Sequence, residues 1–246
     1  DKTKSSGPDR ELNLGLLIPA LGETEIFDPI CGQIANLAGS YKCNLVWGGG
    51  GNIHDKASEM AEQLAKKYIS QKIDGVFFTP LELEDNCDEI NNIIIKMFKA
   101  SGIAVVLLDR DIVPPPLKSE YDVIGINNSE AGFVIGQHLI EKGCKKIGFI
   151  TKPNIATTVH MRFIGLREAV FSAGLGIDSL EEFIIEDDIE AFADQISKRD
   201  DLDALAIYND AAAAELTPRW RSCTWPWVQD RVTARSKADG SRWRST

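Results

Sequence analysis

The alternation of short apolar runs with helical segments is the feature that most constrains what this chain can fold into. It is clearest over residues 122–150, where Asp122–Ile126 is typical of a buried strand and Asn127–Ser129 of a polar stop that caps a helix. Gly143 then tolerates the left-handed backbone that ends a helix, and Ile147–Ile150 starts a second apolar run. We therefore predict one strand–helix–strand unit with short turns, the building block of a parallel sheet.

The same alternation extends over residues 12–216, with connections of a few residues. The further predicted strands are Leu12–Ile18, Cys43–Trp47, Gly75–Thr79, Ala104–Leu108, Phe183–Ile185 and Leu205–Tyr208. Strands that alternate with helices predict a doubly wound α/β fold, whose ligands bind at the carboxyl ends of parallel strands. We expect a linker over 1–11, an N-terminal parallel-sheet lobe over 12–121 and a C-terminal lobe over 122–216.

Helical spacing also predicts which side chains are buried. The first helix is expected to begin at Asp28 and Pro29, and Trp47 is expected to be a core residue. The predicted apolar positions are Ile30, Ile34, Leu37 and Ala38 in the first helix, and Phe133, Val134, Leu139 and Ile140 in the helix after Asn127–Ser129.

The charge of the chain is divided unevenly. Residues 1–216 carry 20 Lys+Arg against 35 Asp+Glu, a net charge of −15, whereas residues 217–246 carry 7 against 2, a net charge of +5. Phosphate neutralisation needs clustered Lys and Arg, so the acidic body is expected to be a poor stand-alone binder of nucleic acid.

Several functional classes lack their sequence signals. No run of about 18 apolar residues could cross a membrane, and the start of the chain has no apolar signal-peptide core. The five scattered cysteines predict reduced thiols in a cytoplasmic protein. Gly48–Gly51 is not followed by the lysine of a phosphate-binding loop, and the acidic groups at 82–89 and 181–190 are expected to be solvated faces. With no metal-ligand spacing and no nucleophile motif, we expect no metal, no cofactor, no membrane association and no enzyme activity.

The composition changes abruptly at Thr217. Residues 217–246 hold four of the five tryptophans and six of the eleven arginines, without clear periodicity. We hypothesise that this segment is a wrong-frame translation product, which sequencing the gene would test. The alternative is a basic, aromatic tail that binds nucleic acid or an anionic surface.

Three segments carry a resemblance to a known family: INNSEAGFVIGQHLIEKGCKKIGFI, MRFIGLREAVFSAGLGID and LDALAIYND. They resemble the effector domain of LacI/GalR-type transcription regulators and, more broadly, the type I periplasmic sugar-binding protein fold. The resemblance covers roughly residues 12–215. The strand–helix units with which that family completes its second lobe are not recognisable after residue 216, so the second lobe is expected to be incomplete.

The resemblance implies a function as well as a fold. In that family two lobes joined by a hinge close on a sugar or a related small polar molecule, and closure shifts a homodimer that carries DNA-binding heads at its N-terminus. We expect a cytoplasmic ligand-sensing domain whose head is missing, so that DNA is a partner only through that missing part. An exported sugar-binding protein of a transporter is the alternative, and an enzyme is a third class.

The main candidate ligand residues lie where predicted strands end, because a sugar needs planar hydrogen-bonding groups. Asp109 and Arg110 follow one strand and resemble a pair with which similar sugar binders grip ring hydroxyls; the alternative is a surface ion pair. Thr79 ends another strand, although many such residues only cap turns. Asn209 ends the last strand, as the family's ligand asparagine does, and Asp210 is expected to cap the next helix.

Two further ligand candidates rest on the resemblance. Arg162 corresponds to a family ligand arginine, and the alternative is an arginine on a helix surface. Phe27 lies in the first loop, where the family often places aromatic residues against the sugar; core packing is the alternative. Glu23 and Glu25 of that loop are secondary candidates as hydroxyl acceptors.

Other polar residues near these candidates are given structural roles. His160 is a lone histidine and is expected to be a loop residue rather than a ligand. Asn127 and Asn128 are expected to set turn and cap geometry, with a ligand contact as the minor alternative.

Overall fold

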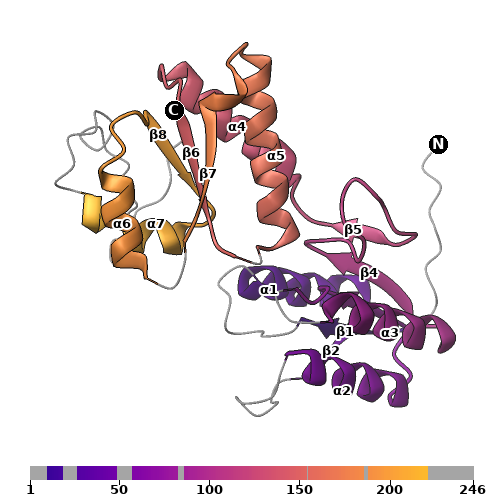
Figure 1. Cartoon of the computed structure of the whole chain (residues 1–246). Helices are drawn as coiled ribbons and strands as arrows, with labels where there is room; N and C mark the ends of the chain where they lie inside the picture. Colours follow the sequence, from indigo (N-terminus) through magenta and orange to yellow (C-terminus); the bar gives the residue numbers. More distant parts are fainter. Residues whose placement is uncertain are drawn as a thin grey trace, which may run out of the picture. The chain divides into compact units, whose positions relative to one another are not determined.

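The computed structural model describes residues 10–18, 27–48, 57–82, 86–153, 155–185 and 188–220, which form two compact α/β units (Figure 1). The first unit is Asp1–Ile126 and the second is Asn127–Thr246. Every strand predicted from the sequence is present within a few residues of its expected bounds. The fold class predicted for the two lobes is therefore confirmed.

The first unit is built on a five-stranded parallel sheet of order β2-β1-β3-β4-β5. Its strands are β1 (Leu12–Leu17), β2 (Cys43–Trp47), β3 (Gly75–Phe78), β4 (Ala104–Leu108) and β5 (Asp122–Ile124), and its helices are α1 (Phe27–Ala38), η1 (Gly39–Tyr41), α2 (Ala57–Ser70) and α3 (Cys87–Ala100). Side chains on successive positions of a strand point to opposite faces. Leu17, Phe78 and Leu107 accordingly pack against α2 and α3, whereas Leu16 and Leu108 pack against α1.

Two burial predictions for this unit are wrong. In α1 the buried side chains are Phe27 and Cys31, while Ile30 is exposed and Leu37 is 53% exposed. The helix begins at Phe27, and of the predicted stripe Ile34 does pack, partly buried, against the cluster that contains Phe27 and Cys31. Trp47 is 53% exposed because it ends β2, the edge strand of the sheet.

The second unit is built on a three-stranded parallel sheet of order β7-β6-β8. Its strands are β6 (Ile147–Thr151), β7 (Leu180–Ile184) and β8 (Ala204–Ile207), and its helices are α4 (Asn128–Glu141), α5 (Thr157–Ser172), η2 (Ile177–Ser179), α6 (Ile189–Ser197), α7 (Asp210–Leu216) and η3 (Thr217–Trp220). Figure 1 shows the sheet between α4 and α5 on one side and α6 and α7 on the other. The described sheet has fewer strands than that of the first unit, in line with the shorter second lobe expected from the sequence.

The strand–helix–strand unit predicted over 122–150 does not form within one sheet. Asp122–Ile124 pairs with β4 in the first unit, whereas Ile147–Thr151 is the central strand of the second. The division between the units therefore falls after Ile126, a few residues later than the boundary expected before Asp122. The local pattern predicts a strand at this position. Hydrophobic periodicity does not predict which other strand it pairs with.

Glycines bring the backbones of α4 and α5 into close contact. A Cβ added to Gly132 would lie 1.9 Å from the backbone oxygen of Arg162, and one added to Gly165 would lie 1.8 Å from that of Ser129. Only glycine leaves room for this close approach of two backbones. Of the predicted stripe of α4, Val134 is exposed, whereas Leu139 and Ile140 pack against the core as predicted, beside the buried Gly132 and Gly136.

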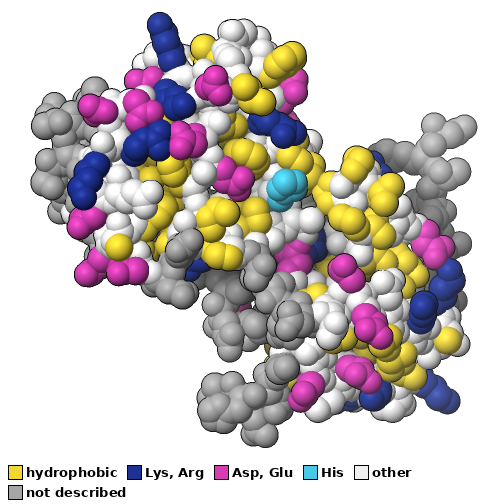
Figure 2. All heavy atoms as spheres, viewed as in Figure 1, with side chains coloured by type: hydrophobic (Ala, Val, Ile, Leu, Met, Phe, Trp, Pro, Cys, Tyr) yellow, Lys and Arg dark blue, Asp and Glu magenta, His cyan; other side chains and the backbone are white. Residues whose placement is uncertain are grey.

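The surface of the described chain carries mixed charge. On the face shown in Figure 2, acidic and basic side chains are interspersed over both units rather than gathered into one field. Hydrophobic side chains are also exposed at the edge strand β5, where Val123 and Ile124 lie partly in solvent. Among the described helices, none combines the length and the hydropathy needed to cross a bilayer.

Candidate functional site

Arg110 is held in a carboxylate cage at the carboxyl end of β4. Its Nη1 donates to Oε2 of Glu82, its Nη2 lies 3.1 Å from Oδ2 of Asp109, and its side chain is only 15% exposed. Asp109 adopts a left-handed backbone, with φ of 70°, next to a glycine: a Cβ on Gly125 would lie 2.8 Å from the Asp109 carbonyl oxygen. The group is therefore a largely buried ion triad rather than an exposed surface pair.

Glu82 is a residue that sequence reasoning missed. It was expected to belong to a solvated acidic face, yet its side chain is as buried as that of Arg110. Its position just beyond the end of β3, the neighbour of β4 in the sheet, was the signal that could have identified it. Carboxyl ends of adjacent parallel strands meet at the same edge of a sheet.

Thr79 lies at the same edge, directly after β3. Its backbone N–H donates to the carbonyl of Leu17 at 3.0 Å, and its side chain is 3% exposed. In the described part of the chain, Thr79 Oγ1 and Arg110 Nε are buried polar atoms without a hydrogen-bond partner. Because buried polar groups are normally satisfied, these two atoms are unusual features of this strand edge.

Arg162 occupies the corresponding edge of the second unit. Its Nε donates to Oδ1 of Asn128 at 2.9 Å, and its Nη1 donates to the carbonyl oxygen of Tyr208, directly after β8, at 3.2 Å. It is thus a partly buried group aimed at a strand end rather than a free arginine of the helix surface. Asn128, expected to set the turn, is buried and orients this guanidinium, while the turn itself is capped by Asn127, whose Oδ1 accepts from Glu130 N.

Asn209 serves as the cap of α7. Its Oδ1 accepts from the backbone N–H of Ala212 at 2.8 Å, the role that was expected of Asp210. Asp210 is instead the first residue of the helix, and its Oδ1 accepts from Ala211 N at 3.1 Å. With this oxygen engaged, the Asn209 side chain offers chiefly its amide N–H groups to a ligand.

The remaining candidates divide between the core and the surface. Phe27 is buried among Leu16, Cys31 and Leu108, so its side chain packs in the core beneath α1. His160 lies on α5 rather than in the expected loop, and it is exposed. Glu23 and Glu25 lie outside the described residues.

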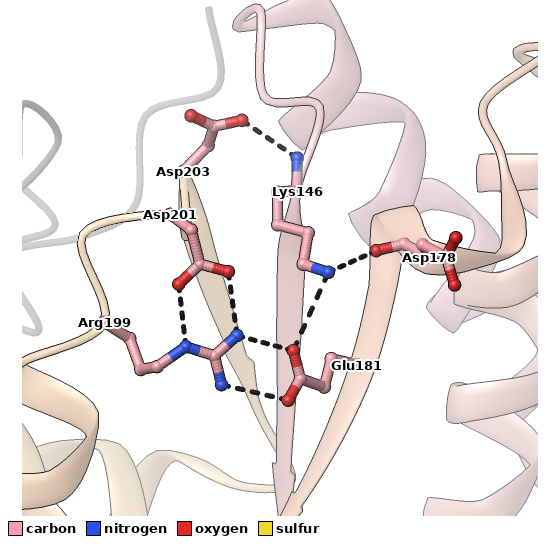
Figure 3. Close-up of polar contacts among 6 residues, drawn as sticks. All are labelled: Lys146, Asp178, Glu181, Arg199, Asp201 and Asp203. Atoms are coloured by element: carbon pink, nitrogen blue, oxygen red, sulfur yellow. Dashed lines mark hydrogen bonds and ion pairs between the residues drawn. The ribbon is translucent and has the colours of Figure 1, made fainter.

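A second cluster of charges lies at the opposite, amino-terminal ends of the second unit's strands (Figure 3). Arg199 donates to both carboxylate oxygens of Glu181, at 2.9 and 2.6 Å, and to both oxygens of Asp201. Asp203 accepts from the backbone N–H groups of Lys145 and Lys146 at 2.7 and 2.9 Å. These contacts join the starts of β6, β7 and β8, so the cluster is a structural clamp away from the ligand edge. Glu181, predicted to lie on a solvated face, has a side chain that is 37% exposed and that also pairs with Arg199 and Lys146.

The clamp predicts an acid-dependent loss of stability. Hydrogen bonds from Arg199 lower the pKa of Glu181, and they lower that of Asp201 to about 2. A carboxylate with a depressed folded-state pKa stabilises fully above its ordinary value and loses that contribution as pH falls through the folded value. Glu181→Gln is expected to cost about 1 kcal/mol at pH 7, as for other partly exposed ion pairs, and progressively less towards pH 2.

Thermal unfolding followed by circular dichroism between pH 7 and pH 2 measures this effect. Glu62→Gln is the matched control, because Glu62 forms an exposed ion pair with Lys66, four residues along the same helix of the first unit. An equal cost for both substitutions at pH 7, or a Glu181→Gln cost that is constant with pH, would contradict the stabilising role of the clamp.

Metal and thiol chemistry find no support in the described residues. No cluster of three or more His, Cys, Asp or Glu side chains in that part of the chain could hold a metal ion. Cys31, Cys43, Cys87 and Cys144 form no disulfide within the described part of the chain. Burial raises the pKa of Cys31 and of Cys144, so neither is poised as a thiolate nucleophile.

Parallel α/β units with polar side chains beyond their strand ends are typical of proteins that bind small polar ligands. No protein-family model matches the chain. Among curated proteins, it is 30% identical over 139 residues to the HTH-type transcriptional repressor PurR of Mannheimia succiniciproducens, covering 56% of this chain and 37% of the relative. The chain spans between about a third and a half of the length of the curated relatives it matches.

Solved structures confirm the fold. The transcription regulator CcpA of Lactococcus lactis matches with a TM-score of 0.63 and 22% identity, over 85% of this chain and 72% of that one. A LacI family transcriptional regulator from Enterococcus faecium with bound ribose matches with a TM-score of 0.60 and 18% identity, over 85% and 71% of the two chains. The resemblance to LacI-type regulators and to the periplasmic-binding-protein-like fold is therefore confirmed, and the relatives are transcription regulators rather than enzymes.

Proposed function

We propose that this chain is the ligand-sensing part of a LacI-type transcription regulator, and that it binds a sugar or a related hydroxyl-bearing molecule. The observation that carries this proposal is the guanidinium of Arg162, which Asn128 and the Tyr208 carbonyl hold at the carboxyl end of β8. In the first unit the caged Arg110, with Asp109 and Glu82, offers further donors and acceptors at a strand edge. Such planar groups suit the paired hydroxyls of a sugar.

The regulatory mechanism follows from differential affinity. A ligand that binds one conformation better than another shifts the equilibrium towards it, and this shift alters the affinity of the whole protein for DNA. We propose that the regulator is a cytoplasmic homodimer and that DNA binding resides in another part of it. The transcription regulators among the curated relatives support this reading over an exported transport protein.

A thermal-shift screen tests the proposal. The protein is heated with ribose, glucose or galactose at 10 mM, and a cognate sugar at about 100 times its dissociation constant is expected to raise the midpoint by roughly 5 °C or more. Sorbitol at the same concentration controls for a general osmolyte effect. If no neutral sugar raises the midpoint above the sorbitol control, and ribose 5-phosphate and glucuronate do not raise it either, the proposed function is wrong.

A further inference from the structure

Both terminal nitrogens of Arg110 are paired with carboxylates inside the first unit. Its Nη1 donates to Oε2 of Glu82, and its Nη2 lies 3.1 Å from Oδ2 of Asp109. Asp109 is the neighbour of Arg110 in the chain, whereas Glu82 comes from beyond the end of β3. The side chains of Glu82 and Arg110 are largely buried, so solvent and salt screen this pair less than an exposed one.

Glu82 decides the net charge of this triad. Two carboxylates face one guanidinium, so Glu82, Asp109 and Arg110 together carry one negative charge at neutral pH, whereas Asp109 and Arg110 alone would be neutral. An anionic group brought to this strand edge therefore approaches a guanidinium whose charge is already more than balanced. An uncharged hydroxyl can instead donate to a carboxylate oxygen without charge repulsion.

Other features of the same strand edge indicate a role beyond stability. Asp109 has a left-handed backbone, and Thr79 Oγ1 and Arg110 Nε are buried without a hydrogen-bond partner in the described part of the chain. Strained backbone and unsatisfied buried polar atoms cost free energy of folding, and natural proteins retain such costs mainly at functional positions. A buried ion pair is likewise weak evidence for a purely stabilising role.

We infer that Glu82 is a specificity-determining residue for the ligand. Through its charge it favours uncharged hydroxyl groups and disfavours carboxylate or phosphate groups at the strand edge of the first unit. This inference rests on the proposed function and deepens it, because it names a residue that discriminates between neutral and anionic sugars.

The test measures how Glu82 changes the ratio of two affinities. Isothermal titration of the unmodified protein, Glu82→Gln and Glu82→Asp compares ribose with ribose 5-phosphate, and glucose with glucuronate. Glu82→Gln is expected to shift the ratio towards the anionic member by about threefold or more, because it removes the excess negative charge. Glu82→Asp keeps the charge and is expected to retain the parent ratio. A residue needed only for stability would change both affinities together.

Two further variants control for general charge and for folding. Glu62→Gln removes the same charge from an exposed ion pair on α2 of the same unit, and it is expected to leave the ratio unchanged. Asp109→Asn removes the other carboxylate of the triad, at a left-handed position that asparagine tolerates. It is expected to shift the ratio in the same direction as Glu82→Gln, and it takes the place of that variant if circular dichroism shows that Glu82→Gln does not fold.

The outcomes separate this inference from the proposed function. The inference is overturned, and the function stands, if Glu82→Gln leaves the ratio unchanged or if Glu62→Gln shifts it equally. A shift with Glu82→Asp as large as that with Glu82→Gln would also overturn it, since geometry rather than charge would then be responsible. If no sugar of either kind binds to the unmodified protein, the proposed function fails and the inference fails with it.

Discussion

Gly165→Ala is expected to destabilise the second unit by roughly 3 kcal/mol or more, at the upper end of overpacking effects. The added Cβ would lie 1.8 Å from the backbone oxygen of Ser129, so α4 and α5 would have to separate. A flexible side chain could move aside, but a helix backbone cannot yield without moving the whole helix. Because Asn128 and Arg162 lie on these two helices, the hydrogen bond that orients the Arg162 guanidinium would lengthen as well.

Chemical denaturation measured by circular dichroism gives the free energy of unfolding, and Gly176→Ala is the matched control. Gly176 belongs to the same unit, has no neighbour within 4 Å of the added Cβ and has a φ of −70°, so alanine fits there. The control is expected to stay within about 0.5 kcal/mol of the parent. A parent-like stability for Gly165→Ala would show that the close helix contact is not required.

Arg110→Met is expected to lower the free energy of unfolding of the first unit by about 2–4 kcal/mol. Removing the guanidinium takes away the cation that the largely buried carboxylates of Glu82 and Asp109 both contact. The methionine side chain retains much of the apolar stem, so the loss reports mainly the two lost ion pairs rather than a cavity.

A double-mutant cycle isolates that electrostatic cause. Glu82→Gln removes one of the two carboxylates, and Arg110→Met combined with Glu82→Gln is expected to be more stable than the sum of the single losses implies, by about 1 kcal/mol or more. Denaturation of the four proteins at pH 7 provides the values. Strictly additive losses would mean that Arg110 and Glu82 do not interact in solution.

The large share of the fold that could be predicted from the sequence reflects local signals. The strands Cys43–Trp47 and Ala104–Leu108 have their predicted bounds, and the polar stop at Asn127 caps α4 as expected. Apolar runs, caps and helix-ending glycines act over a few residues, so a single segment contains the information that defines it. The exposed Leu37 and Trp47 mark the limit, because which face is covered depends on the neighbouring elements.

The sequence predicted where the candidate ligand residues lie in the fold, but not which groups their side chains contact. The predicted strand ends placed Asp109, Arg110 and Asn209 correctly in the fold. They did not show that the Asn209 side chain caps a helix, and the sequence did not decide that Phe27 packs in the core. Glu82 and Asn128 were given other roles because each acts on an arginine far along the chain. A solvated carboxylate and a buried one have the same sequence signal.

By itself, the sequence determined the order of strands and helices, the parallel α/β class and the resemblance to LacI-type regulators, because hydrophobic period and turn residues are local properties of the chain. The tertiary structure alone decided that Asp122–Ile124 joins the first sheet and that α4 and α5 meet through Gly132 and Gly165. It alone decided that Arg110 contacts carboxylates, whereas among the described residues Arg162 contacts an amide oxygen and a backbone carbonyl. These outcomes depend on which distant backbones and charges approach one another, and the free energy of such contacts exists only once the chain has folded.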